Sequence, residues 1–450
     1  MASLLIKGGH VLSPEDKLDG TFDVLVQNGV IHQIAPDLKL DATDILDAQG
    51  LVVCPGFVDL HAHLRVPGGE ISETLETGLA AAVAGGFTSV CAMPNTRPVN
   101  DNIESTRGLI EAAQAIGLAR VFPIAAVSKG SEGVELTDFE QLVEAGAVAF
   151  SDDGRPVKTA DLMRQAMEKA LFLEVPIIDH CEDPKLSAGG AINQGTVSER
   201  LGLKGISNAS EDVCVARDLG VAEVTGAHLH VAHLSTAQAC KMVREAKGRG
   251  VRATCEVTPH HFTLTDDAIE KYGTHAKMNP PLRGSADLSA ILAAIADGTV
   301  DALATDHAPH APELKAKPIA EAPFGVIGFE TALALALTQL VHGRKVPLPY
   351  LTHVGSPSLG NAVPARKISL PHLIVLMSTN PARIIRQRVN PNLGRLKLGG
   401  IADITLFDPE CDWTYRAAGG RSKSRNSPFE GWTFKGLVTT TIVAGKVVYG

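Results

Sequence analysis

The chain has 450 residues, of which 45% are hydrophobic and 20% charged, but only 4% are aromatic. This composition excludes a disordered chain, because there is enough apolar sequence to bury a large core. Aliphatic side chains must form that core, which favours parallel strands covered by helices. The formal net charge is −9, and no run of five or more lysines and arginines occurs. The charge therefore argues against nucleic acid and against an anionic membrane surface as partners.

The cysteines and the apolar runs indicate a cellular compartment. The seven cysteines are scattered, odd in number and without a CxxC pair, which argues against a disulfide framework. The first residues lack the apolar segment of a secretory signal, and no run of 18 apolar residues could span a bilayer. We therefore expect a cytoplasmic protein.

The two ends of the chain have β character. Residues 1–52 are predicted to form short strands, and Asn28-Gly29 between two alternating apolar stretches predicts a β-hairpin. β character returns in residues 393–450. Each segment is short for an independently stable domain, so we expect both to pair into one composite β domain.

Residues 53–392, between these ends, have a different sequence pattern: apolar runs alternate with amphipathic segments. The predicted strands are 52–64, 88–94, 119–127, 147–153, 176–183, 228–235, 251–258 and 301–307. The predicted helices are 72–86, 102–117, 139–146, 159–174, 209–226, 236–250, 286–298 and 329–343, with a further helix over 370–386. Eight strand–helix units predict a (β/α)8 TIM-type barrel of the α/β class. The alternative is an open doubly wound sheet, although no nucleotide-binding glycine motif opens any helix.

Side chains that bind metals occur where five of the predicted strands end. His61 and His63 are two residues apart on the first strand, so both imidazoles project from the same face. The other strand ends carry Asp152-Asp153, Asp179-His180, His233 and Asp306-His307. The carboxyl ends of barrel strands meet at one mouth, where barrel enzymes have their active sites. Four histidines and at least two aspartates suffice for two divalent metals sharing a bridging ligand, and this donor set suits zinc, with manganese or cobalt as alternatives.

Longer motifs carry a resemblance to a known family. PGFVDLHAHLRVPGGEISET, MPNTRP, FSDDG, DHCED, HLS, MNPPLR, ATDHAPH and APFGVIGFET resemble the cyclic amidohydrolases and, within them, the class I bacterial dihydroorotases. The similarity extends over the whole chain, including ADITLFDPE and NSPFEGWTFKG near its C-terminal end. An HxH motif alone is shared by many amidohydrolases. The combination of HLRVPG with MPNTRP and TDHAPH indicates a much smaller group within them.

The resemblance implies a ligand set. His61, His63 and Asp306 would hold one metal, His180 and His233 the other, and Asp153 would bridge them. Strand periodicity alone does not choose between Asp152 and Asp153, which face opposite ways; the family pattern selects Asp153. Many relatives, including hydantoinases, use a carbamylated lysine as the bridge, but the first lysine after this strand is Lys158. The bridge would therefore be a plain carboxylate, with one or two zinc ions per subunit.

The resemblance also implies a reaction: the zinc-dependent, reversible hydrolysis of dihydroorotate to N-carbamoyl-aspartate in pyrimidine synthesis. A metal would activate water and polarise the ring carbonyl, while Asp306 accepts a proton and passes it to the leaving nitrogen. The guanidinium of Arg65 suits a carboxylate of the substrate. The implied substrate contacts are His63, Arg65, Asn95, Asn279, His310, Phe324 and Gly325.

The remaining polar side chains near the strand ends receive supporting roles. We expect His260, His261 and His307 to be structural or to support the metal ligands, and Cys181 and Cys255 to be packing residues. The loop over residues 308–323 is long, polar and rich in proline and alanine. Such loops often cover binding sites, so we expect it to become ordered over the substrate.

Two other functions compete with this interpretation. An allantoinase or hydantoinase would belong to the same superfamily, but Arg65 and the absent bridging lysine argue against both. Some amidohydrolase-like chains have lost their metal ligands and act as scaffolds for aspartate carbamoyltransferase, whereas every ligand is present here. A homodimer is the default expectation for assembly, and association with that transferase remains an open alternative.

Overall fold

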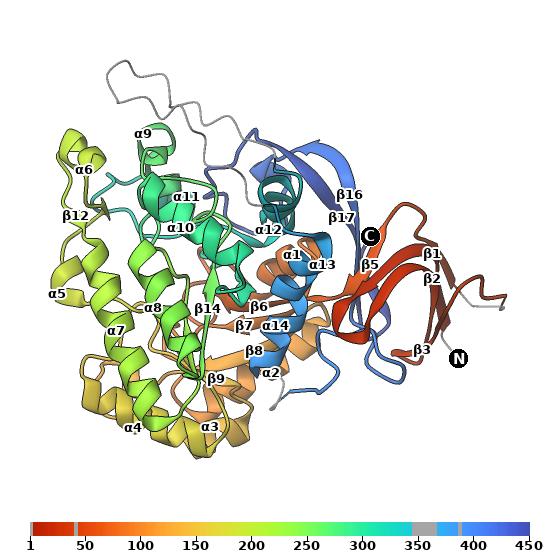
Figure 1. The fold of residues 1–450 in the computed structure, drawn as a ribbon, viewed down its shortest axis with the longest axis horizontal. Coiled ribbons are helices and arrows are strands. Elements are labelled where there is room, and N and C mark those ends of the chain that lie inside the picture. The colour runs from red at the N-terminus through yellow and green to blue at the C-terminus, as the bar shows by residue number, and fades with distance from the viewer. Residues whose placement is uncertain (1–2, 40–43, 344–366, 386–388) are drawn as a thin grey trace.

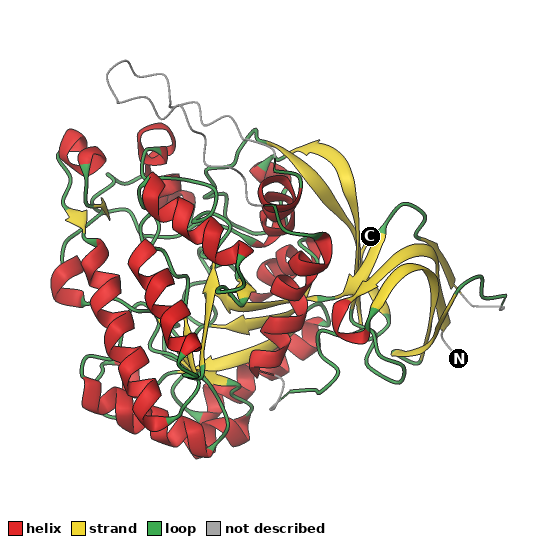
Figure 2. Ribbon diagram, viewed as in Figure 1, coloured by secondary structure: helices red, strands yellow, loops and turns green. Residues whose placement is uncertain are grey.

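The parallel barrel forms the larger part of the molecule. A computed structural model describes residues 3–39, 44–343, 367–385 and 389–450 (Figures 1 and 2). Eight parallel strands follow each other in the order β15-β14-β13-β10-β9-β8-β7-β6. Their bounds are β6 Phe57–Ala62, β7 Phe87–Ala92, β8 Arg120–Ala125, β9 Ala149–Phe150, β10 Ile177–Asp179, β13 Leu229–Val231, β14 Ala253–Val257 and β15 Ala302–Leu303. Each predicted apolar run therefore overlaps one barrel strand.

The first and last barrel strands meet and close the ring. Ala62 and His307 form a parallel bridge, and the backbone N–H of His63 donates to the His307 carbonyl at 2.8 Å. Below this contact, the carboxylate of Asp59 accepts a hydrogen bond from the backbone N–H of Thr305 at 3.0 Å. The prediction of a (β/α)8 barrel is confirmed, and the open-sheet alternative is wrong.

Helices surround the strands, and polar side chains fix where several of them begin. The eight predicted helices are α1 Leu75–Ala84, α2 Ile103–Ile116, α3 Phe139–Ala145, α4 Ala160–Phe172, α7 Asn208–Thr225, α8 Ala237–Gly248, α10 Ser285–Ala296 and α12 Phe329–Ala336. Thr74, Asn102, Asp138, Thr159 and Thr236 each accept a backbone N–H of the first turn. These caps satisfy donors that the helix leaves unpaired, so each loop ends at a defined residue.

Shorter elements extend the loops at the barrel mouth and continue the chain behind α12. The loop elements are α5 Pro184–Ser187, β11 Ile192–Asn193, α6 Thr196–Leu201, β12 Gly205–Ile206, α9 Ala268–Tyr272 and α11 Pro312–Lys315. The helix predicted over 370–386 is α13 Leu370–Ile374, a π-helical turn and α14 Asn380–Ile385; residue 386 lies outside the described residues. Among the described residues, no helix is long and apolar enough to cross a membrane.

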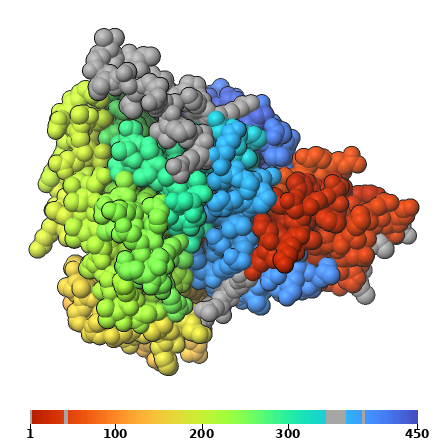
Figure 3. Space-filling model, viewed as in Figure 1, coloured from red at the N-terminus to blue at the C-terminus, as the bar shows by residue number. Residues whose placement is uncertain are grey.

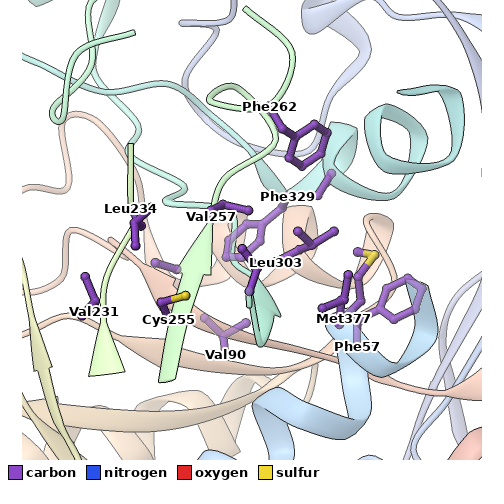
Figure 4. Close-up of a cluster of buried hydrophobic side chains, with 14 of the residues drawn as sticks. Phe57, Val90, Val231, Leu234, Cys255, Val257, Phe262, Leu303, Phe329 and Met377 are labelled. Carbon is purple, nitrogen blue, oxygen red and sulfur yellow. The ribbon is translucent and has the colours of Figure 1, made fainter. Parts of the chain in front are cut away.

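Aliphatic and phenylalanine side chains fill the space between strands and helices. Figure 4 shows Val90 and Leu303 from the strands near Phe329 of α12 and Met377. All four side chains are buried, and Phe329 has no exposed surface. Burying a side chain of this size contributes about 1.5–3 kcal/mol, so this cluster is a main source of stability beneath the mouth.

A second sheet is built from both ends of the chain. Its order is β18-β17-β16-β5-β1-β2-β3, with β4 beside β1. The bounds are β1 Ser3–Ser13, β2 Leu18–Gln27, β3 Val30–Ala35, β4 Asp44–Asp47, β5 Val52–Pro55, β16 Ile404–Thr414, β17 Thr433–Val443 and β18 Lys446–Tyr449. β5 and β16 pair antiparallel and join the two ends, which lie side by side in Figure 3. The predicted fold class, a barrel with a small β domain from both ends, is thereby confirmed.

The junction between the two sheets lies at a glycine. β5 belongs to the β sheet and β6 to the barrel, so the chain passes from one to the other at Gly56. A Cβ atom there would lie 2.2 Å from Oγ1 of Thr88, so no larger residue fits. The finer division, with the β domain at 1–52 plus 393–450 and the barrel at 53–392, stays a prediction.

Candidate metal centre and active site

Asp153 lies among four histidines at the carboxyl ends of the barrel strands. Its Oδ1 is 3.4 Å from Nε2 of His61, 3.5 Å from Nδ1 of His180 and 3.7 Å from Nε2 of His233. Its Oδ2 is 3.7 Å from Nε2 of His63. All five side chains are buried. The aspartate thus touches both predicted pairs of histidines, which is the position that a bridging ligand needs.

Asp306 completes the group on the side of the first strand. Its Oδ1 is 3.0 Å from Nε2 of His63 and 3.7 Å from Nε2 of His61. Asp306 and His233 adopt left-handed backbone conformations, with φ of 45° and 30°, which are rare for residues with a Cβ atom. These residues follow their strands by two or three positions, so the bend of the chain, and not strand alternation, directs their side chains into the mouth.

The centre fits a divalent cation. Ligand atoms of His61, His63 and Asp306 lie within 4.8 Å of one another, as do those of His61, Asp153 and His233. Nε2 of His61, Oδ1 of Asp153 and Nδ1 of His233 are buried without any hydrogen-bond partner. Unpaired buried polar atoms are costly, and a cation next to Nε2 of His61 and Oδ1 of Asp153 would satisfy both. The nitrogen of His233 that faces the centre is Nε2, 3.7 Å from Asp153.

The charges of the centre favour a cation too. Burial opposes the charge on Asp153, yet the neighbouring histidines, His61 first, hold the pKa of its carboxyl well below the usual value. Burial also opposes protonation of His61, but Asp153 and Glu256 raise the pKa of its ring well above the usual value. Asp306, hydrogen-bonded to His63, has a lowered pKa despite its burial. The carboxylates are therefore ionised, and a metal can replace the proton on the ring.

Partners outside the centre orient three of its histidines. Nδ1 of His61 lies 3.0 Å from a carboxylate oxygen of Glu256, which can only accept, so Nδ1 donates and Nε2 faces the centre. Nδ1 of His63 donates in the same way to Oδ1 of Asn95 at 2.9 Å. His180 is reversed: its Nε2 lies 3.3 Å from Glu182, which leaves Nδ1 for the centre.

Glu256 and Glu182 were not identified from the sequence. Glu256 lies in β14 with no exposed surface and also contacts Nε2 of His230 at 3.1 Å. A carboxylate inside the apolar run RATCEV is the signal that could have found it, since a buried charge needs a partner. Glu182 follows His180 by two residues, but its contact depends on a loop conformation that sequence does not show.

The structure separates the two neighbouring aspartates. The carboxylate of Asp152 accepts hydrogen bonds from the backbone N–H of Ser128 at 3.0 Å and from the Ser128 hydroxyl, so it holds a turn. Lys158 donates to the carbonyl of Glu132 at the surface and does not reach the centre. The arrangement agrees with a carboxylate bridge through Asp153.

Cationic and polar groups line one side of the centre. Arg65 donates through Nε to the carbonyl of Pro309 at 3.1 Å, and its Nη2 lies 3.3 Å from Nε2 of His310. Burial lowers the pKa of Arg65 to about 10, so the guanidinium remains charged at neutral pH. Nε2 of His310 donates to the Phe324 carbonyl at 2.6 Å. The predicted carboxylate contacts Arg65 and His310 are thus together.

Gly325 is required next to this pair. Its φ is +138°, and a Cβ atom would lie 2.7 Å from the carbonyl oxygen of Ala308 and 3.0 Å from Nε2 of His310. Glycine therefore lets the backbone at residues 324–325 approach Ala308 and His310 closely.

The predicted substrate contacts Asn95 and Asn279 are tied to the metal ligands. Nδ2 of Asn95 donates to Oδ2 of Asp153 at 2.9 Å. Nδ2 of Asn279 donates to Glu182 at 2.6 Å, whereas its Oδ1 is buried without a partner. Asn95 therefore positions two ligands, and Asn279 is tied to the partner of a third, His180, with an unpaired acceptor of its own.

The remaining histidines at this end differ in their contacts. His261 lies 2.8 Å from the Thr258 hydroxyl and 2.9 Å from the Pro280 carbonyl, and the ring of His307 lies 4.2 Å from that of Phe329. His260 stands apart, because its Nε2 is buried without a partner. Cys181 and Cys255 are buried free thiols. These placements agree with supporting roles for His261 and His307.

Solved structures with the same architecture place the protein in a class. An L-hydantoinase (dihydropyrimidinase) from Arthrobacter aurescens superposes with a TM-score of 0.84, at 23% identity, over 100% of this chain and 96% of the other. A D-hydantoinase from Thermus sp. gives a TM-score of 0.79, at 25% identity, over 99% and 95% of the two chains. The barrel, its small β domain and the His/Asp centre together have the architecture of the amidohydrolase class.

Sequence comparisons narrow the class to one family. A family model described as dihydro-orotase-like matches residues 50–239. A dihydroorotase of Geobacter metallireducens is 45% identical over 448 residues, and one of Syntrophus aciditrophicus is 46% identical over 448 residues. Both comparisons cover 99% of this chain and 99% of the relative. The chain belongs to the dihydroorotase family.

Proposed function

We propose that the protein catalyses the reversible, zinc-dependent hydrolysis of the cyclic amide of dihydroorotate to N-carbamoyl-aspartate, a step of pyrimidine synthesis. The observation that carries this proposal is the pairing of Arg65 and His310 beside the His/Asp centre in a chain about 45% identical to dihydroorotases from end to end. A guanidinium next to the reacting ring suits a substrate that carries its own carboxylate.

The side chains divide the work of the reaction. Arg65, with His310 and the backbone at Phe324 and Gly325, binds the carboxylate and one edge of the ring. Oδ1 of Asn279, which has no protein partner, accepts a ring N–H. Asp306 takes the proton of the attacking water and delivers it to the leaving ring nitrogen, as its ionised state and its place beside His61 and His63 allow.

His61, His63 and Asp306 would hold one metal ion, and His180 and His233 a second, with Asp153 between them. Bound there, zinc would supply an activated water and a Lewis acid for the ring carbonyl. The unpaired atoms Nε2 of His61 and Oδ1 of Asp153 support this set. A zinc titration of metal-depleted enzyme, followed by turnover and metal content, tests it; one metal per chain would indicate that Asp153 need not bridge two.

An assay of the purified enzyme on dihydroorotate, allantoin and hydantoin separates the proposed substrate from its competitors. We expect turnover of dihydroorotate and none of the other two. Hydantoin hydrolysis without dihydroorotate hydrolysis would overturn the proposal in favour of a hydantoinase, and inactivity of a zinc-loaded sample on all three would favour a scaffold role. The hydantoinase structures share the fold, at 25% identity or less, and do not decide the substrate.

We also infer that the enzyme works in the cytoplasm as a homodimer. All seven cysteines are unpaired thiols, as a reducing compartment predicts. Light scattering of the purified protein tests the dimer. The same measurement with added aspartate carbamoyltransferase tests whether the two enzymes associate.

A further inference from the structure

Residues 421–427, between β16 and β17, leave the β sheet and lie across the loops at the barrel mouth. We call them the strap. The backbone N–H of Lys423 donates to the carboxylate of Glu73 at 2.8 Å, and the Ser422 hydroxyl donates to the same group. The Ser424 hydroxyl donates to the Ser72 carbonyl at 2.7 Å. The strap is therefore fixed to the loop that follows β6.

Asn426 in the strap joins the two loops on either side of α11. Its Nδ2 donates to the carbonyl oxygens of Ala308 and Gly325, both at 3.0 Å. Its Oδ1 accepts the backbone N–H of His310 at 3.1 Å, and its own carbonyl accepts the N–H of Ile327 at 3.0 Å. The side chain is buried, with 2% of its surface exposed.

These hydrogen bonds hold the backbone on both sides of the proposed carboxylate site. His310 lies in the loop after β15, and Gly325 in the segment just before α12. One amide group thus fixes the spacing between His310 and the 324–325 backbone, using both donors and its acceptor. An aspartate of the same shape could not do this, because a carboxylate donates no hydrogen bond.

Packing alone does not fix this spacing. A cavity of about 150 Å³ lies next to these loops, lined by His275, His310, Lys315, Arg425 and Asn426 among others. On another side, Nζ of Lys315 donates to the Gly325 carbonyl at 2.9 Å. Nε2 of His310 donates to the Phe324 carbonyl, so this contact places the ring, whereas the strap holds the backbone of His310.

We propose that Asn426 is a positioning residue for substrate binding: it holds His310 and the Phe324–Gly325 backbone at the separation that receives the carboxylate-bearing edge of the substrate. The proposal rests on the proposed function for the identity of the substrate. The strap supplies no predicted metal ligand or substrate contact. Under this proposal it still contributes to the active site, because Asn426 holds the two loops in place.

Kinetics of three variants test this role. We expect N426A and N426D to raise KM for dihydroorotate about 10- to 100-fold, with a much smaller change in kcat, because misplaced binding groups weaken binding. The matched control is N193A. Asn193 is also buried, with 6% exposed, and bridges Asp266 and Arg283 through its amide, away from the two loops. N193A should lose about as much stability as N426A, with an unchanged KM.

The N426D variant distinguishes positioning from simple filling of space. If Asn426 only filled volume, N426D would keep the wild-type KM while N426A would not, and that result would overturn the proposal. So would a wild-type KM in both variants.

Hydrogen exchange separates this proposal from the proposed function. Deuterium uptake measured by mass spectrometry should rise in residues 308–310 and 324–327 of N426A, and not in N193A. This readout needs no substrate, so it still tests the positioning role of Asn426 if the wild-type enzyme fails to hydrolyse dihydroorotate. Unchanged uptake in both segments would overturn the positioning role.

Discussion

Two buried polar clusters lie near the same end of the barrel, and they differ in how completely their atoms are paired. In the first, Arg283 donates to Ser235, Asn193, Glu211 and the Ile206 carbonyl. Both carboxylate oxygens of Glu211 accept hydrogen bonds in return, from the Ser235 and Thr236 backbone and from the Ser235 hydroxyl. In the second, the His/Asp centre, two ligand atoms, Nε2 of His61 and Oδ1 of Asp153, have no partner at all.

This difference separates structure from function. The Arg283 cluster is a closed network, which fixes the loops after β13 and β14 and gains nothing from a further group. The His/Asp centre is an open network, and its two unpaired ligand atoms, Nε2 of His61 and Oδ1 of Asp153, lie 3.4 Å apart. Variants in the closed cluster should therefore change stability, and variants in the open one should change activity.

Metal removal should have the largest effect. Dialysis against a chelator is expected to lower turnover at least about 1000-fold, since a metal in such a site contributes several kcal/mol to the transition state. Turnover of carbamoyl-aspartate before and after zinc is added back measures the effect, and cooperative unfolding of the depleted sample is the control. Full activity in a metal-free sample would contradict an open metal site.

The substitution Asp306→Asn should have the second largest effect on turnover. The substitution keeps the shape but removes the proton acceptor, so kcat is expected to fall about 10²- to 10⁴-fold. The measurements are kcat and the metal content of the variant, because Asp306 also faces His61 and His63. Near-normal turnover would refute its role in proton transfer, whereas the melting temperature should change little.

Arg283→Met tests the closed cluster. It leaves the buried carboxylate of Glu211 without its cation, which should cost about 3–5 kcal/mol of unfolding free energy in urea denaturation. Activity per folded molecule should remain near that of the wild type. The double variant with Glu211→Gln is the control and should recover part of the loss. A large fall in kcat at full stability would break the distinction between the two clusters.

Asp152→Asn should have the smallest effect. Its carboxylate is paired with Ser128, so the loss should be about 1 kcal/mol of unfolding free energy, with turnover within a few-fold of the wild type. Its neighbour provides the contrast, since Asp153→Asn should lower zinc affinity and turnover together. If the two substitutions had equal effects on turnover, the assignment of Asp153 between the histidine pairs would be wrong.

The barrel could be predicted because its signals are local. Each strand–helix unit carries its own apolar run, helical pattern and cap, and chain order then fixes strand order. His61 and His63 could be placed for the same reason, since one strand holds both. The predicted strands extend further than the observed ones: β9 and β15 have two residues each, and the ligands that follow them lie beyond the strand.

The supporting residues could not be predicted because their partners are distant in sequence. Glu256 meets His61 across 195 residues, and Asn426 meets His310 across 116. Whether a glutamate or asparagine pairs with a neighbour, caps a helix or faces water is decided only when those distant segments meet. Residue type together with the family motifs sufficed to predict the metal ligands, whereas the residues that orient them required the three-dimensional structure.

The pairing of β5 with β16 has a consequence for synthesis on the ribosome. Cys54 and Thr405 are partners in that ladder, although 351 residues separate them. At typical elongation rates of about 5–20 residues per second, the first strands wait roughly 20–70 seconds before their partner emerges. During that interval β5 presents an open edge, the kind of surface that recruits wrong strands. The late arrival of β16 therefore makes the nascent chain a natural client for chaperones.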